Sequence, residues 1–280
     1  MTRGTRGLTG SDGLPVRETG RWVYDKNYYI ERYFDIFSRG VGKKWKGKLA
    51  YVDLFAGVGR NFVRENKDEV DGSPLLALKH GFAKYVFVDK PHIMKVLEKR
   101  ISGHPKRSMI TTLAGDCNDV ISDVLAVVPS NHLTLAFIDP TGIHIKFEAI
   151  RRLVVDRKVD LLMTIQFGMA IRMNLRQYLK ADRAALDSFM GTKNWRDDYR
   201  EGESISQIGR RVLERYRNQL TTLKYTTVRD REIEVRSDAR NLFLYVIVLA
   251  SRHALGAEYW RKVTAVAPSG QRRLNLQFEG

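Results

Sequence analysis

The chain has 280 residues, 43% of them hydrophobic and 29% charged, a composition typical of a water-soluble globular protein. Its 48 Lys and Arg against 32 Asp and Glu give a net charge of +16, which favours a polyanionic partner such as nucleic acid. The single cysteine, Cys117, excludes an intramolecular disulfide. Because we find neither a membrane-spanning run nor a signal peptide, we expect a cytoplasmic protein that binds no membrane.

The first residues have a different composition from the rest of the chain. Residues 1–20 are rich in glycine and almost lack large apolar side chains, which predicts a flexible basic tail. Residues 28–38 have helical spacing and predict an N-terminal helix that packs on the domain. Since no later break in composition is evident, residues 21–280 are expected to form a single α/β domain with this helix and C-terminal additions.

Apolar, β-branched runs then alternate with segments of helical spacing, which predicts repeated βα units. Strands are expected at 49–54, 84–89, 108–113, 132–138 and 159–166, with helices at 73–81, 91–101, 118–128, 145–155 and 170–190. A helix at 205–220, strands at 224–228 and 242–250 joined by a polar turn, and a helix at 255–264 follow. This order predicts a Rossmann-like α/β fold: a mostly parallel central sheet, helices on both faces and a C-terminal antiparallel strand pair.

The first strand opens into a glycine-containing loop. An apolar run ends at Asp53 and is followed by Phe55, Gly57 and Gly59. Glycine allows a tight turn and lets a ligand approach the backbone closely. The pattern Asp-x-Phe-x-Gly-x-Gly resembles motif I of class I S-adenosylmethionine (SAM) methyltransferases. This resemblance implies the class I methyltransferase fold, with SAM as the cofactor.

Acidic residues follow the first three strands. The resemblance assigns Asp53 to the methionine moiety or to ordering of the loop, and Asp89 to the ribose hydroxyls. Asp116 matches the residue that hydrogen-bonds the adenine amine, with the backbone N–H of Cys117 beside it. Each acid alone is better explained as a helix cap or turn residue. Three such acids behind a Gly-x-Gly loop favour a SAM site.

A fourth motif follows the fourth strand. Asp139-Pro140-Thr141-Gly142 resembles the Asp-Pro-x-Gly segment of tRNA guanine-N2 methyltransferases, which implies catalytic roles for Asp139, Pro140 and Gly142. Exocyclic-amine methyltransferases usually carry a second proline and an aromatic residue here. Thr141 and Gly142 supply neither, so Phe147 or Phe167 is the candidate for stacking the base. Asp139-Pro140 is also explained as a turn that ends the strand.

Across most of its length the chain is similar to the three-Cys-motif partner proteins (TcmP). The matching segments are residues 53–57, 72–78, 137–142, 161–172 and 245–260. The family usually has Asp-Pro-Phe-Gly where this chain has Thr141 in the third position. The resemblance implies a methyltransferase-like fold and a genomic partner with three clustered cysteines, similar to a radical-SAM or iron–sulfur protein. It implies no particular substrate.

Four arginines crowd one predicted helix: Arg210, Arg211, Arg215 and Arg217. They form either a surface that contacts phosphates or an ordinary solvated helix face. Together with the net charge, they favour a nucleic acid as the substrate. The leading hypothesis is therefore a SAM-dependent methyltransferase that acts on DNA or RNA at an exocyclic base nitrogen.

Three other functions stay open. The first is a catalytically degenerate, SAM-binding and nucleic-acid-binding partner of the three-cysteine protein. The second is a metal-dependent nuclease in which four aspartates, Asp53, Asp89, Asp116 and Asp139, bind Mg²⁺, although the Gly57/Gly59 loop argues against it and we expect no resident metal. The third is a small-molecule methyltransferase, which the high positive charge makes less attractive.

Overall fold

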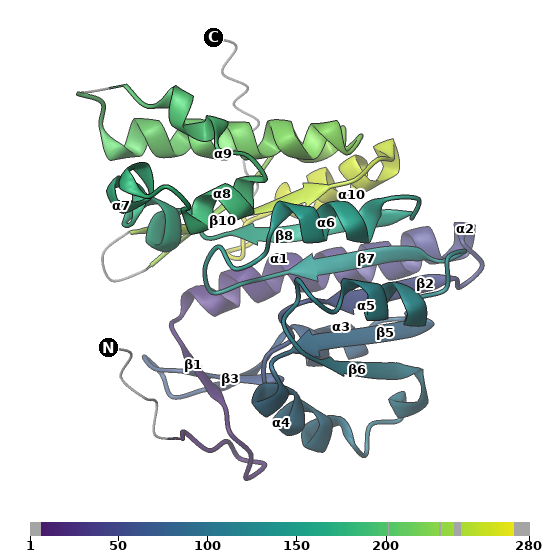
Figure 1. The fold of residues 1–280 in the computed structure, drawn as a ribbon. Helices are drawn as coiled ribbons and strands as arrows, with labels where there is room; N and C mark the ends of the chain where they lie inside the picture. The colour runs from purple at the N-terminus through teal and green to yellow at the C-terminus, as the bar shows by residue number, and fades with distance from the viewer. Residues whose placement is uncertain (1–6, 201, 230, 238–241, 272–280) are drawn as a thin grey trace.

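A seven-stranded sheet forms the centre of the protein (Figure 1). The computed structural model describes residues 7–200, 202–229, 231–237 and 242–271. In spatial order the strands are β6 (Ile110–Ala114), β5 (Lys84–Asp89), β2 (Leu49–Asp53), β7 (Leu133–Ile138), β8 (Val159–Ile165), β10 (Phe243–Ala250) and β9 (Ile233–Arg236). The five strands expected in the first two thirds of the chain are confirmed to within two residues at each end.

The strand directions match the expected arrangement of a mostly parallel sheet with a C-terminal antiparallel pair. β6, β5, β2, β7 and β8 are parallel, and β10 pairs antiparallel with both β8 and β9. The strand order reverses at β2, because the chain proceeds first to β5 and β6 and then returns to β7 on the other side. In open sheets a ligand crevice forms at the carboxyl ends of the strands at such a reversal.

Helices cover both faces of the sheet, as predicted. Alternate residues of β2 show why: Ala50 and Val52 belong to one core, Leu49 and Tyr51 to the other. One face carries α5 (Ile121–Val127), α6 (Phe147–Val154), α8 (Ala185–Met190) and α9 (Ile205–Thr222). The other carries α1 (Trp22–Ile36), α3 (Ser73–Leu78), α4 (Pro91–Ile101) and α10 (Ala254–Thr264).

Shorter elements complete the described chain. Next to α1 lie the π-helix η1 (Phe37–Val41) and α2 (Gly42–Lys44). The π-helix η3 (Phe167–Arg172) and α7 (Leu175–Lys180) follow β8. Three 3₁₀ turns are η2 (Arg107–Met109), η4 (Asn194–Asp198) and η5 (Thr227–Arg229). None of the described helices is long and apolar enough to cross a membrane.

The N-terminal segment, residues 7–19, is structured, which corrects the expectation of a flexible tail there; residues 1–6 lie outside the described part. β1 (Arg17–Thr19) pairs in parallel with β3 (Arg60–Val63), which pairs in turn with β4 (Glu69–Asp71). The sequence did not predict this order, because the segment has no apolar face to bury. Backbone pairing and ion pairs hold it instead.

Two other predictions were wrong in detail. The first late strand is β9, within the predicted polar turn. Residues 224–228 form a turn instead, in which Tyr225 is buried and its hydroxyl donates to the Val159 carbonyl (2.8 Å). The predicted helix at 170–190 is divided into η3, α7 and α8, and Gly191 in the left-handed region ends α8. Tertiary burial outweighs local periodicity at both places.

Candidate active site

A cavity of about 680 Å³ opens at the carboxyl ends of β2, β5, β6 and β7. Its volume lies within the range of roughly 300–1,000 Å³ typical of small-molecule sites. The N-terminal segment forms part of its wall, so residues far apart in the sequence enclose one space. The lining includes Arg17, Glu18, Phe55, Gly57, Val58, Asp89, Lys90, His92, Asp116, Cys117, Asp139, Thr141 and His144.

The two glycines of the β2 loop have different roles. Gly57 has φ +65°, lines the cavity, and an added Cβ would meet nothing within 4 Å. Its N–H donates to Oδ2 of Asp89 (2.7 Å). Gly59 has φ +87°, but a Cβ there would lie 2.9 Å from the side chain of Leu97, and it does not line the cavity. Gly59 therefore allows the loop to pack on α4, and only Gly57 faces the site.

Asp53 lies beneath the loop and does not line the cavity. Its Oδ1 accepts from the N–H of Phe55 (3.1 Å), and its Oδ2 accepts from the hydroxyl of Tyr51 (3.1 Å). Burial raises the pKa of Asp53 to about 7, although hydrogen bonds, the Ser73 hydroxyl among them, oppose the rise. Of its two expected roles, the geometry fits ordering of the loop, while Phe55 itself lines the cavity.

Asp89 and Asp116 are placed around the cavity as the motif reading expected. Asp89 ends β5, and its second oxygen accepts from the N–H of Lys90 (2.7 Å). Asp116 is exposed, and hydrogen bonds from Asn118 hold its pKa below the usual value. Cys117 is buried, which raises the pKa of its thiol to about 12, so it lines the site as a neutral group.

Asp139, at the end of β7, has two partners that sequence reasoning missed. The ammonium of Lys26, from α1, lies 2.7 Å from Oδ2, and the hydroxyl of Thr164, from β8, donates to Oδ1 (2.5 Å). Burial alone would raise the pKa of Asp139, but Lys26 and Thr164 outweigh it and the pKa is lowered. Asp139 is therefore an ionised, oriented hydrogen-bond acceptor at the cavity wall.

The residues after Asp139 form the neighbouring wall. Pro140 and Gly142 are buried, and a Cβ on Gly142 would lie 3.0 Å from the ring of His144. Thr141 and His144 line the cavity. Phe147 is instead packed in the core, with its ring 6.2 Å from that of Tyr216, so it does not supply the aromatic contact considered for it. The side chain of Phe167 lies outside the described set.

The arginines of α9 are partly neutralised. Arg211 pairs with Glu203, and Arg217 pairs with Glu214 and Glu232. Arg210 is exposed, and Arg215 also has an interaction of its own. Because two of the four cations already face carboxylates, this helix offers less positive charge to phosphates than the sequence suggested.

The four acids considered as magnesium ligands do not converge. Asp53 faces the core and Asp139 is paired with Lys26. Within the described residues there is no group of three or more His, Cys, Asp or Glu that could hold a metal ion. Asp89, Asp116 and Asp139 line the cavity, whereas Asp53 does not.

No family model and no curated protein matches the chain. The similarity to the TcmP proteins therefore rests on the sequence motifs alone.

Several solved structures have a similar fold. Protein LPL1258 from Legionella pneumophila has a TM-score of 0.48 and 10% identity over 87% of this chain and 90% of that chain. Cofactor-bound Rv0187 from MTB has a TM-score of 0.44 and 9% identity, over 86% of this chain and 84% of that chain. Geranyl diphosphate methyltransferase in complex with GPP and sinefungin has a TM-score of 0.40 and 11% identity, over 74% of this chain and 73% of that chain. Similarity this low describes the fold and says nothing about a substrate.

Proposed function

We propose that the protein is a SAM-dependent methyltransferase. One observation carries this: a single cavity at the strand-order reversal joins the Gly57 loop to the aspartates that end β5, β6 and β7. Its donor and acceptor groups fit the cofactor. Asp89 would hold the ribose hydroxyls, Asp116 and the Cys117 N–H the adenine, and the open backbone at Gly57 leaves room beside them.

When bound, SAM supplies an activated methyl group, so the protein mainly has to align an acceptor and exclude water. Asp139 is placed for alignment. Both of its oxygens are fixed, one by Lys26 and one by Thr164, and lone pairs remain for a donor in the cavity. The Pro140–Gly142 backbone and Thr141 would form one side of the acceptor pocket.

The ionisation of Asp139 favours an amine acceptor. A hydroxyl needs a general base near its operating pH, and a carboxylate whose pKa is lowered is a weak base. An exocyclic amine attacks with its lone pair and needs only an acceptor that orients its N–H bonds. The geometry of Asp139 therefore supports methylation at nitrogen, which we place on a nucleic-acid base.

A cationic surface on the same side of the sheet as the cavity supports a polyanionic substrate. We call the acceptor-edge cations the exposed residues Arg172, Arg176, Lys180 and Arg183, on and beside η3 and α7. These elements follow the carboxyl end of β8, on the side toward which the β8 arrow points (Figure 1). Within the described residues none of the four has an ion pair, so all are available to phosphates.

The first test is binding of SAM and S-adenosylhomocysteine, measured by calorimetry on the purified protein. We expect micromolar binding that Asp89→Ala abolishes. Asp119→Ala is the matched control, because Asp119 is exposed near Asp116 but does not line the cavity. Absence of binding by folded wild-type protein would refute the proposal. Positive binding would justify a labelled-methyl screen over DNA and RNA.

A catalytically degenerate partner of a three-cysteine iron–sulfur protein is the second candidate, supported by the motifs shared with the TcmP proteins. The two functions differ in their dependence on Asp139. Asp139→Asn should abolish methyl transfer and retain ligand binding in the enzyme. The same substitution should leave the ligand affinity and the nucleic-acid affinity of a purely binding protein unchanged.

A further inference from the structure

The cavity contains one cation whose role the proposed function does not explain. Arg17, on β1, lines the cavity, is exposed, and has no ion-pair partner within the described residues. Its charge is close enough to lower the pKa of Asp139. Glu18, the next residue, faces Arg64 instead (3.3 Å).

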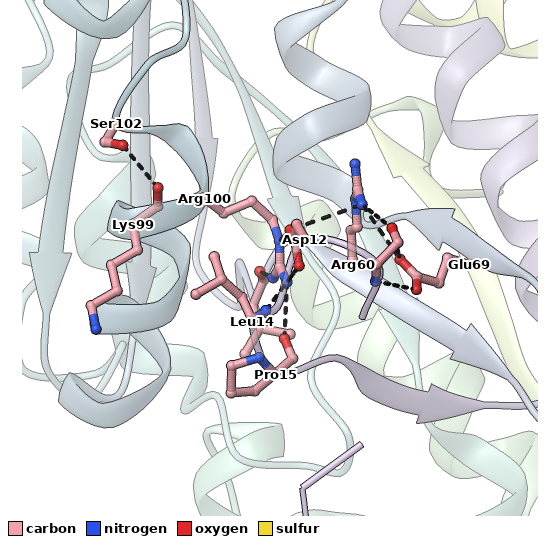
Figure 2. A network of polar contacts seen from close by, with 10 residues as sticks. Asp12, Leu14, Pro15, Arg60, Glu69, Lys99, Arg100 and Ser102 are labelled. Atoms are coloured by element: carbon pink, nitrogen blue, oxygen red, sulfur yellow. Dashed lines mark hydrogen bonds and ion pairs between the residues drawn. The ribbon is translucent and has the colours of Figure 1, made fainter. Parts of the chain in front are cut away.

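The segment that carries Arg17 is held in place by the pairing of β1 with β3 and by Arg100, so Arg17 stays at the cavity. Arg100, from α4, donates to both carboxylate oxygens of Asp12 (2.6 and 3.0 Å) and to the carbonyl of Pro15 (3.1 Å), as Figure 2 shows. It also donates to the carbonyl of Val58, in the glycine loop. Arg100 thus joins the N-terminal segment to the cavity loop directly.

The position of Arg17 along the cavity indicates which ligand group it meets. Asp116 and Asp89 occupy the β6 and β5 end, whereas Asp139 marks the β7 end. Lys90, the other Lys or Arg that lines the cavity, lies beside Asp89 at the β5 end, and Lys26, which does not line it, is paired with Asp139. Arg17 is therefore the cation left for an anion near the β7 end of the described cavity.

SAM carries a single anionic group, the carboxylate of its methionyl part. With the adenosine at Asp89 and Asp116, this part extends toward the β7 end. We propose that the Arg17 guanidinium binds that carboxylate, an inference that rests on the proposed function. A guanidinium can bind a carboxylate through two parallel hydrogen bonds, which lysine cannot reproduce. The N-terminal segment would thereby complete the cofactor site.

Two ligands separate this contact from the rest of the site. S-adenosylhomocysteine has the carboxylate, and 5′-methylthioadenosine has the same nucleoside without the amino-acid part. In calorimetry we expect Arg17→Gln to weaken the binding of S-adenosylhomocysteine by about 10- to 100-fold, the range of a charge-assisted hydrogen bond. The affinity for methylthioadenosine should stay unchanged. Arg17→Lys should retain part of the affinity, since it keeps the charge and loses the paired geometry.

Arg64→Gln is the matched control, because it loosens the segment at Glu18 without removing a cavity cation. It should affect both ligands little and equally. If Arg17→Gln binds both ligands equally more weakly, or binds both as the wild type does, the inference is overturned. A loss confined to the binding of a polyanion would also overturn it and would assign Arg17 to a substrate phosphate. If the wild type binds neither ligand, the proposed function itself fails.

Discussion

Two aspartates at the carboxyl edge of the sheet have opposite pKa shifts. Asp53 has only neutral donors around it, so burial dominates and raises its pKa to about 7. Asp139 is also mostly buried, but the Lys26 ammonium and the Thr164 hydroxyl lower its pKa. The charge of each carboxyl at neutral pH is thus decided by its partners, and of these two only Asp139 is an anion that lines the cavity.

Asp53 should make the protein less stable as the pH rises. A carboxyl with a raised folded-state pKa favours folding below its unfolded pKa of 3.8, and this contribution is lost as the pH rises to about 7. We expect the free energy of unfolding, measured by urea titration between pH 4 and 8, to fall less steeply in Asp53→Asn. Some dependence of the unfolding free energy on pH should remain in Asp53→Asn, because the pKa of Asp160 is also raised to about 7. Identical slopes in both proteins would contradict the prediction.

Lys26 should act as a positioning residue for Asp139. In Lys26→Met burial is no longer opposed by a cation, so the pKa of Asp139 should rise. The acid limb of methyl transfer should move to higher pH, while Lys26→Arg should restore the wild-type profile. A carboxyl-carbon NMR titration, assigned with Asp139→Asn, measures the same shift without a substrate. An unchanged titration would remove Lys26 from this role.

At the scale of elements, close backbone contacts decide where helices break and where strands meet. η3 begins directly after β8 and crosses β10. A Cβ on Gly168 would lie 1.8 Å from the carbonyl oxygen of Phe243, so only glycine permits this crossing. The N-terminal segment depends on polar contacts instead, above all the pairing of Asp12 with Arg100.

Gly168→Ala should destabilise the protein by roughly 1–3 kcal/mol, because backbone at β10 has to move. Gly103→Ala is the control, since a Cβ there meets nothing within 4 Å and φ is not positive. It should change stability by less than about 0.5 kcal/mol. Denaturant unfolding measures the stability of both variants. Equal stabilities would contradict the prediction and show that the backbone at η3 and β10 shifts without cost.

Asp12→Ala should release the N-terminal segment while the sheet stays folded. Arg100 and burial act oppositely on this carboxyl, and the hydrogen bond from Arg100 prevails, giving Asp12 a pKa of about 2. The contact is therefore complete at neutral pH and is lost only in strong acid. Hydrogen exchange should rise in residues 8–18, with little change elsewhere. Ser102→Ala, which removes only a local contact to Lys99, should leave exchange unchanged (Figure 2).

At the scale of the whole molecule, the charge of +16 does not by itself say where a polyanion binds. Two lysine- and arginine-rich regions lie at opposite ends of the sheet. The acceptor-edge cations follow the end of β8, whereas exposed Lys43, Lys44, Lys46 and Lys48 precede the start of β2. Only the first group lies on the side of the cavity.

Changing each group of four cations to glutamine tests this, because both variants lose the same charge. We expect the acceptor-edge variant to bind DNA or RNA more weakly and with a shallower dependence on salt concentration. The variant at residues 43–48 should retain most of its affinity. Fluorescence anisotropy at several salt concentrations gives both slopes, and equal losses would show that binding follows net charge alone.

The sequence by itself determined the parallel part of the sheet and the location of the cavity. Apolar runs must be buried, and Gly57, Asp89, Asp116 and Asp139 follow strands whose carboxyl ends meet at one edge. Local signals suffice for this. They failed at β9 and at residues 170–190, where burial against distant elements outweighs periodicity.

Only the tertiary structure decided the partners of these residues. Lys26 and Asp139 are 113 positions apart and no local pattern links them. Arg17 belongs to a segment whose composition favours disorder, and Arg100 and β3 hold it against the cavity. The role of a charged side chain depends on its burial and its partner, and both are set by contacts distant in the sequence.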